Sequence, residues 1–224
     1  MDIVVPRTRQ TLTRCEERLL VFCALDAYGS YDVSGIELGR QKPNRILREQ
    51  IRLMNDSMRA RSPYAVWAES GLLEAELREL AELPTDADLV DMADEEWAGV
   101  KVSLKATYER VMRPRLGAAA ATKILYLHRP RLIAITDAEV AEFFECQTLP
   151  PVDRAMAVAE HVREMARFAG NDSALTAIQQ YLSSRTVGGR PIAVSKVRIL
   201  DALIWMKQQE AYKGLWEVNG WGPL

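Results

Sequence analysis

Hydrophobic residues recur at helical spacing along most of this chain. One apolar face is shared within residues 14–28 by Leu19, Leu20, Cys23 and Ala27. Comparable faces, bounded by prolines, glycines and capping residues, predict further helices at residues 43–61, 71–82, 95–112, 118–128, 137–144, 152–168, 173–184 and 194–207. Residues 132–136 form a short apolar run that is either a strand-like connector or a turn. The pattern therefore predicts an all-α fold.

The helical pattern is not interrupted by a linker, a repeat or a low-complexity segment. A length of 224 residues is sufficient for one substantial core. We therefore expect a single compact multi-helix domain over residues 1–224. Its last part, residues 208–224, is rich in glycine and tryptophan and is expected to pack irregularly on the helices.

Composition narrows the class of protein. Hydrophobic residues make up 48% and charged residues 27%, as in ordinary globular proteins. No apolar run approaches the roughly 20 residues of a membrane span, and no signal peptide begins the sequence. Three cysteines without C-x-x-C spacing favour free thiols in a reducing cytoplasm. With only two histidines and no phosphate- or dinucleotide-binding loop, neither a metal nor a cofactor is expected.

Charge is segregated along the chain. The net charge of −2 argues against a protein that coats nucleic acid indiscriminately. However, residues 40–61 carry seven cations and two carboxylates, whereas residues 69–96 carry eleven carboxylates and one cation. Two interpretations stay open: these blocks form one basic and one acidic surface, or they neutralise each other after folding.

The best candidate for chemistry lies between Arg110 and Asp137. This stretch has no carboxylate before Asp137 and places Lys123 beside the apolar face of an alanine-rich helix. A lysine that is partly desolvated there is disfavoured as an ammonium ion, which favours a nucleophilic amine. Asp137 could orient that amine or stabilise a developing cation. Alternatively, Lys123 extends to solvent and Asp137 only caps the next helix.

The segment LGAAAATKILYLH followed by RPRLIAITDAEV resembles oxidised-guanine DNA glycosylase-like proteins of the helix-hairpin-helix superfamily. The resemblance covers residues 116–140. It implies that Gly117 is the hairpin glycine, Lys123 the Schiff-base nucleophile and Asp137 the catalytic carboxylate acting on a flipped-out nucleotide. The sequence departs from that family in two ways, because the L-x-G-x-G hairpin is absent and the lysine-to-aspartate interval is shorter.

A longer resemblance rests on three spaced blocks. The blocks are MNDSMRARSP at residues 54–63, TKILYLHRPRL at residues 122–132 and SKVRILDALIWM at residues 195–206. They are similar to the recurring blocks of an uncharacterised bacterial family of helical proteins. This resemblance implies a family and a helical fold, and no activity.

Several arginines are candidates for binding nucleic acid or a small anion. Arg59 and Arg61, with the hydroxyl of Ser62, could hold a phosphate at a helix end, or could compensate the dipole of that helix. Arg129 and Arg131 could clamp phosphates or pair with the acidic block, residues 69–96. The basic stretch, residues 110–137, adds Arg113, Arg115 and Gly117 to this set.

Three hypotheses follow. The first is a DNA-binding protein with a glycosylase-like core and a Lys123–Asp137 site. The second is a non-enzymatic helical module whose charge segregation serves protein association, including self-association. The third is an enzyme acting on a small anion held by Arg59, Arg61, Arg129 and Arg131. The position of the Lys123 amine discriminates between the first two hypotheses.

Overall fold

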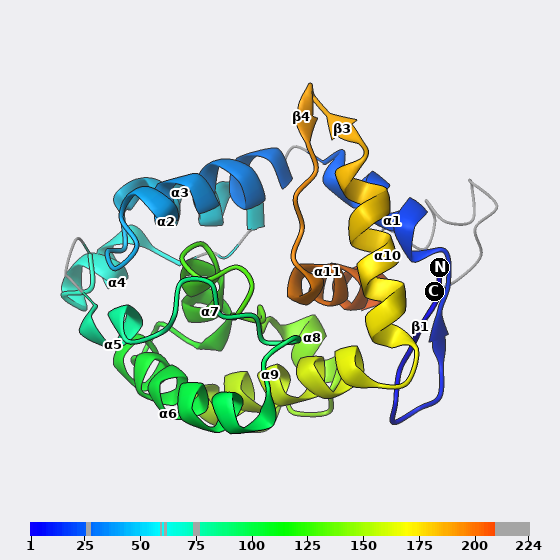
Figure 1. Ribbon diagram of the computed structural model, residues 1–224. Helices are drawn as coiled ribbons and strands as arrows, with labels where there is room; N and C mark the ends of the chain where they lie inside the picture. Colours follow the sequence, from blue (N-terminus) through cyan, green and yellow to red (C-terminus); the bar gives the residue numbers. More distant parts are fainter. Residues whose placement is uncertain (26–27, 59, 61, 74–76, 209–224) are drawn as a thin grey trace.

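A computed structural model describes residues 1–25, 28–58, 60, 62–73 and 77–208 and shows a mainly α-helical fold (Figure 1). Within these residues the helices are α1 (Cys15–Cys23), η1 (Tyr28–Gly35, a π-helix), α2 (Ile36–Gln41), α3 (Arg48–Met58), α4 (Tyr64–Glu69), α5 (Arg78–Ala81), α6 (Asp94–Val111), α7 (Ala118–Tyr126), α8 (Ala138–Phe143), α9 (Pro151–Arg167), α10 (Asn171–Ser183) and α11 (Lys196–Gln208). Two antiparallel two-stranded sheets pair β1 (Ile3–Val4) with β2 (Thr11–Leu12), and β3 (Thr186–Val187) with β4 (Arg190–Pro191).

Helices α7 and α11 lie in the middle of the molecule (Figure 1). Helices α2 and α3 lie on one side of them, α6 and α9 on the opposite side, and α1 and α10 close a third. Eight of the nine residues of α7 are buried, because alanines and aliphatic side chains occupy nearly every turn of this helix. The sequence of α7 provides almost no polar face, and a helix of this kind is normally buried, which explains its central position.

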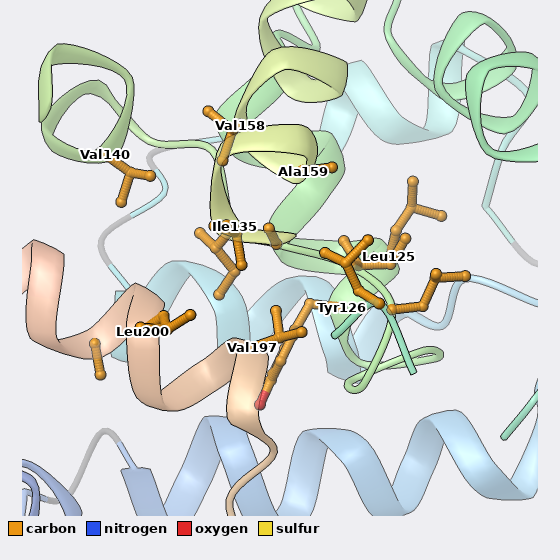
Figure 2. Close-up of a cluster of buried hydrophobic side chains, with 14 of the residues drawn as sticks. Leu125, Tyr126, Ile135, Val140, Val158, Ala159, Val197 and Leu200 are labelled. Carbon is orange, nitrogen blue, oxygen red and sulfur yellow. The ribbon is translucent and has the colours of Figure 1, made fainter. Parts of the chain in front are cut away.

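Side chains from four helices meet in the core beside α7 (Figure 2). The labelled side chains are Leu125 and Tyr126 of α7, Val140 of α8, Val158 and Ala159 of α9, Val197 and Leu200 of α11, and Ile135 from the connection before α8. All eight residues are at most 2% exposed. The apolar run at residues 132–136 is therefore a buried connector that leads into α8.

The N-terminal segment packs closely on the end of α7. A Cβ atom added to Gly39 would lie 2.0 Å from the carbonyl oxygen of Leu127, a separation that atoms do not reach without a backbone shift. Glycine is therefore required at this position so that α2 can approach α7. This close approach places η1, and with it Asp32, next to the centre of the molecule.

The sequence predicted the long helices well, since α6, α9, α10 and α11 begin and end within about two residues of the expected positions. The helix expected over residues 71–82 is wrong, because among the described residues of that range only Arg78–Ala81 are helical. Asp94 lies in the first turn of α6 and does not cap it. The tail expected to pack on the helices falls, beyond Gln208, outside the described residues.

Candidate functional site

Lys123 and Asp137 come together in the interior. The Lys123 Nζ lies 3.8 Å from the Asp137 Oδ2, and each side chain is only 8% exposed. The amine also donates to the carbonyl oxygen of Met58 at the end of α3, at 3.4 Å. Lys123 is therefore buried beside polar partners and does not extend to solvent.

Asp137 occupies the N-cap position of α8, as predicted. Its Oδ1 accepts a hydrogen bond from the backbone N–H of Val140 at 3.1 Å. The second oxygen remains available to Lys123. Burial raises the pKa of Asp137, and the charge of Lys123 and the Val140 hydrogen bond oppose that rise in part. The carboxylate of Asp137 therefore both caps α8 and forms the ion pair with Lys123.

A second charged group lies behind this pair, centred on Arg198 of α11. Its Nε and one Nη bind the two carboxylate oxygens of Asp32, each at 2.8 Å. The other Nη binds Asp201, one helical turn along α11. The hydroxyl of Tyr126 donates to Asp32 at 2.9 Å. Arg198, Asp32 and Asp201 are all at least 94% buried.

Aromatic rings enclose this arginine. The guanidinium carbon of Arg198 lies 5.0 Å from the ring centre of Phe22 and 5.4 Å from that of Tyr126. Tyr31 stacks on Tyr126 with ring centres 5.8 Å apart. The Tyr31 hydroxyl donates to the backbone carbonyl of Lys123. Tyr31 therefore connects the Arg198 group to the helix that carries Lys123.

These residues form one polar cluster inside the molecule, which we call the core cluster. Its members are Tyr31, Asp32, Lys123, Tyr126, Asp137, Arg198 and Asp201. Sequence reasoning identified Lys123 and Asp137 as candidates, and the structure adds Arg198 and Asp201, which form an intrahelical pair three residues apart. Sequence reasoning missed Asp32 and Tyr31, because no local pattern indicates a contact between residues 166 positions apart.

Every residue of the core cluster is at most 7% exposed. A pocket of about 390 Å³ lies elsewhere, between the β1–β2 hairpin and the ends of α8 and α11. Arg7, Phe144, His161 and Lys207 are among its lining residues, whereas Lys123 and Asp137 are not. A ligand would therefore reach the core cluster only after neighbouring segments move.

Arg129 is buried and has a structural role. Its five N–H donors bind the carbonyl oxygens of Leu83, Leu80, Pro43 and His128 and the side chain of Asn44. The residue is 2% exposed. Since all donors are used inside the protein, Arg129 presents none to an external phosphate.

The other arginines of the basic stretch lie on the surface. Arg131 binds Asp88 at 2.9 Å, and Arg115 lies 3.4 Å from Glu69. These contacts confirm that the basic stretch and the acidic block pair in part. Arg113 is exposed and donates to a carbonyl in its own turn.

The turn between α6 and α7 has an unusual backbone. Arg115 adopts φ 80°, the left-handed conformation that favours glycine, whereas Gly117 has φ −71°. Gly117 stands at the N-cap of α7 and offers no side-chain cap. The first backbone N–H groups of α7 consequently have no capping side chain.

Arg59 and Arg61 lie outside the described residues. The neighbouring Ser62 is buried, and its hydroxyl accepts a hydrogen bond from the indole N–H of Trp67 at 2.9 Å. The backbone of Ser62 is bound on both sides by the Asn55 amide. Ser62 therefore fixes the chain after α3, and its hydroxyl is already engaged.

Comparisons with known proteins were made on the whole sequence. Residues 51–208 match the family of unknown function DUF6308, and the chain belongs to this family. This result confirms the uncharacterised helical family indicated by the spaced sequence blocks. Comparison with curated proteins found no match. Comparison with solved structures also found none.

Proposed function

We propose that this member of the DUF6308 family is a nucleic-acid-binding protein with a glycosylase/lyase-like site formed by Lys123 and Asp137. The observation that carries the proposal is the approach of the Lys123 amine to the Asp137 carboxylate in a nearly dry environment, at 3.8 Å. Both groups are those that the glycosylase resemblance pairs. The aspartate also caps the helix that follows the connector, which fixes its orientation.

The chemistry requires an amine and a carboxylate in contact. Lys123 in its neutral form would attack the sugar C1′ of an extruded nucleotide, and the glycosidic C–N bond would break with its electron pair leaving on the base. The proton released by the lysine would pass to the departing base. Asp137 would stabilise the positive charge that develops on the sugar, an effect that burial strengthens.

The α6–α7 turn is the surface that we assign to the phosphate backbone. Arg113 and Arg115 are exposed on it, and the uncapped N-terminus of α7 follows directly. Cations and free backbone N–H groups are both suited to phosphate oxygens. The free, buried cysteines support a reducing compartment such as the cytoplasm for this activity.

Borohydride trapping tests the chemistry. Duplexes carrying damaged bases or abasic sites are incubated with the protein and reduced, and covalent adducts are counted. We expect an adduct with the wild type and none with Lys123→Arg, which keeps the charge beside Asp137 but forms no Schiff base. Lys105→Ala removes an exposed lysine of α6 and serves as the matched control. Absence of an adduct on every substrate would exclude the lyase mechanism.

A second function is favoured by the ion pairs of Arg115 with Glu69 and Arg131 with Asp88, which reduce the net positive surface. On this alternative the chain is a non-enzymatic association module. Salt titration of DNA and RNA binding separates the two functions, because each neutralised phosphate releases counterions and steepens the salt dependence. A binding signal that is absent or insensitive to salt, together with a concentration-dependent oligomer in solution, supports the association module.

A further inference from the structure

The core cluster contains more negative than positive groups. Its charged members are two cations, Lys123 and Arg198, and three carboxylates, Asp32, Asp137 and Asp201. All five residues are at most 7% exposed. An uncompensated charge in such surroundings is strongly unfavourable, and a buried acid normally responds by binding a proton.

The hydrogen bonds indicate which carboxylate is protonated. Asp32 has both oxygens bound by Arg198 and receives a third donor from Tyr126, so its ionised form is fully solvated by the protein. Asp137 accepts from Val140 through one oxygen and faces Lys123 with the other. By contrast, Asp201 is bound by Arg198 through Oδ2 alone, and its buried Oδ1 has no hydrogen-bond partner.

We propose that Asp201 is the protonated carboxylate of the core cluster and is thereby a positioning residue that keeps Asp137 ionised beside Lys123. With Asp201 neutral, the cluster consists of two ion pairs, Lys123 with Asp137 and Arg198 with Asp32, and one uncharged acid. The inference concerns the same site as the proposed function. Its test needs no substrate, so the two proposals can fail separately.

The groups that act on Asp201 come from several elements. Burial raises the pKa of Asp201 to about 7, with a contribution from the negative charges of Asp137, which begins α8, and Asp32 of η1. Arg198, on the same helix, opposes this rise through its charge and its hydrogen bond. Tyr31 is influenced by both Asp137 and Asp201, and burial holds its own pKa well above 10. The tyrosine therefore remains a neutral donor while Asp201 titrates.

Loss of the proton changes the site in a defined way. The Asp201 O–H bond breaks, its electron pair stays on the carboxylate, and the proton leaves to solvent. The charge of the Asp201 carboxylate, which is coupled to that of Asp137, then disfavours the ionised form of Asp137.

The sign of the effect on stability follows from the direction of the pKa shift. The native protein binds the Asp201 proton more tightly than the unfolded chain, in which the carboxyl has its ordinary value of 3.8. The stabilisation is therefore complete below that value and is lost as pH rises toward about 7. Asp201→Asn mimics the protonated acid and removes this pH dependence.

Asp201→Asn and Asp32→Asn form a matched pair, since both aspartates bind Arg198. Melting temperatures of the full-length variants are measured at pH 5 and pH 8.5. We expect Asp201→Asn to gain about 5 °C relative to wild type between the two pH values. Asp32→Asn should melt well below wild type at both. An Asp201→Asn variant that is destabilised equally at both pH values, or as much as Asp32→Asn, would overturn the proposal.

A spectroscopic measurement on the wild type covers the case in which a variant does not fold. The carboxyl ¹³C resonances of the assigned protein are followed from pH 4 to pH 9. The resonance of Asp201 should titrate near neutral pH. An Asp201 that is already ionised at pH 5 contradicts the proposal, because the proton of the cluster would then have to be elsewhere.

Discussion

Arg198 and Arg131 each pair with an aspartate, but one pair lies in the dry centre of the molecule and the other on its surface. Arg198 binds Asp32 through two hydrogen bonds, and both side chains are 3% exposed. Arg131 binds Asp88 through one contact while its own side chain is 53% exposed. Both pairs join a guanidinium to a carboxylate, but they differ in the number of hydrogen bonds and in their exposure to water.

The difference shows where charge matters to this protein. On the surface, water replaces a lost partner at little cost, so the Arg131 pair contributes little to stability. In the centre, removal of one partner leaves a buried charge that nothing solvates. The core cluster therefore determines both the stability of the fold and the geometry of the Lys123–Asp137 site. The exposed Arg131 pair contributes little to either.

The largest effect is expected for Arg198→Ala. This change leaves Asp32 and Asp201 buried without a cation, and we expect a loss of about 3–5 kcal/mol in the free energy of unfolding. Urea unfolding measures it. Arg131→Ala is the matched control, and an equal loss in the two variants would refute the distinction between the regions.

Arg129→Met comes next. Arg129 belongs to the basic stretch in sequence but is buried like the core cluster. Its guanidinium donates to the carbonyl oxygens of Pro43, Leu80 and Leu83. The change leaves those carbonyls without a partner, and a loss of about 3 kcal/mol is expected in urea unfolding. A stability equal to wild type would show that water satisfies the same carbonyl groups.

Gly39→Ala tests the approach of the N-terminal segment to α7. The added methyl group would meet the Leu127 carbonyl at 2.0 Å, so α2 must move outward at an expected cost of about 2 kcal/mol. Thermal unfolding measures the loss. Gly99→Ala is the control, since nothing lies within 4 Å of an added Cβ there and the residue is within a helix. An unchanged melting temperature for Gly39→Ala would contradict the close contact.

The smallest effects on stability are expected for Arg115→Ala and Arg131→Ala, each below about 1 kcal/mol. Their binding effects separate the proposed functions. If the α6–α7 turn contacts phosphates, Arg115→Ala should weaken binding to all sequences and lower the salt slope by about one unit. A slope that stays the same in gel-shift titrations would remove Arg115 from the interface.

The helices with one clear apolar face could be predicted from the sequence. In α9 and α10 the buried residues recur at helical spacing between capping or breaking residues, so periodicity was sufficient to predict both helices. Asp137 could be recognised as a cap because an aspartate directly precedes a short apolar helix. In each case the information is local.

The remainder depends on long-range packing. The π-helix η1 has almost no periodic pattern, and the partners of its Asp32, Tyr126 and Arg198, lie far along the chain. Arg129 and Arg131 are indistinguishable in sequence, yet one is buried by carbonyl groups that converge from distant segments. From the sequence, both are interpreted as surface cations, because the neighbouring residues do not reveal that distant carbonyl groups surround Arg129.

The bidentate pair between Asp32 and Arg198 joins η1, near the start of the chain, to α11, the last described helix. Opening of either region breaks the same two hydrogen bonds and exposes the same carboxylates, so neither can unfold alone at low cost. Backbone amides of η1 and α11 should accordingly exchange with solvent at similar rates, as parts of one cooperative unit. A chain begun at Ile51 would contain all of α11 and still lack Asp32, the bidentate partner of Arg198.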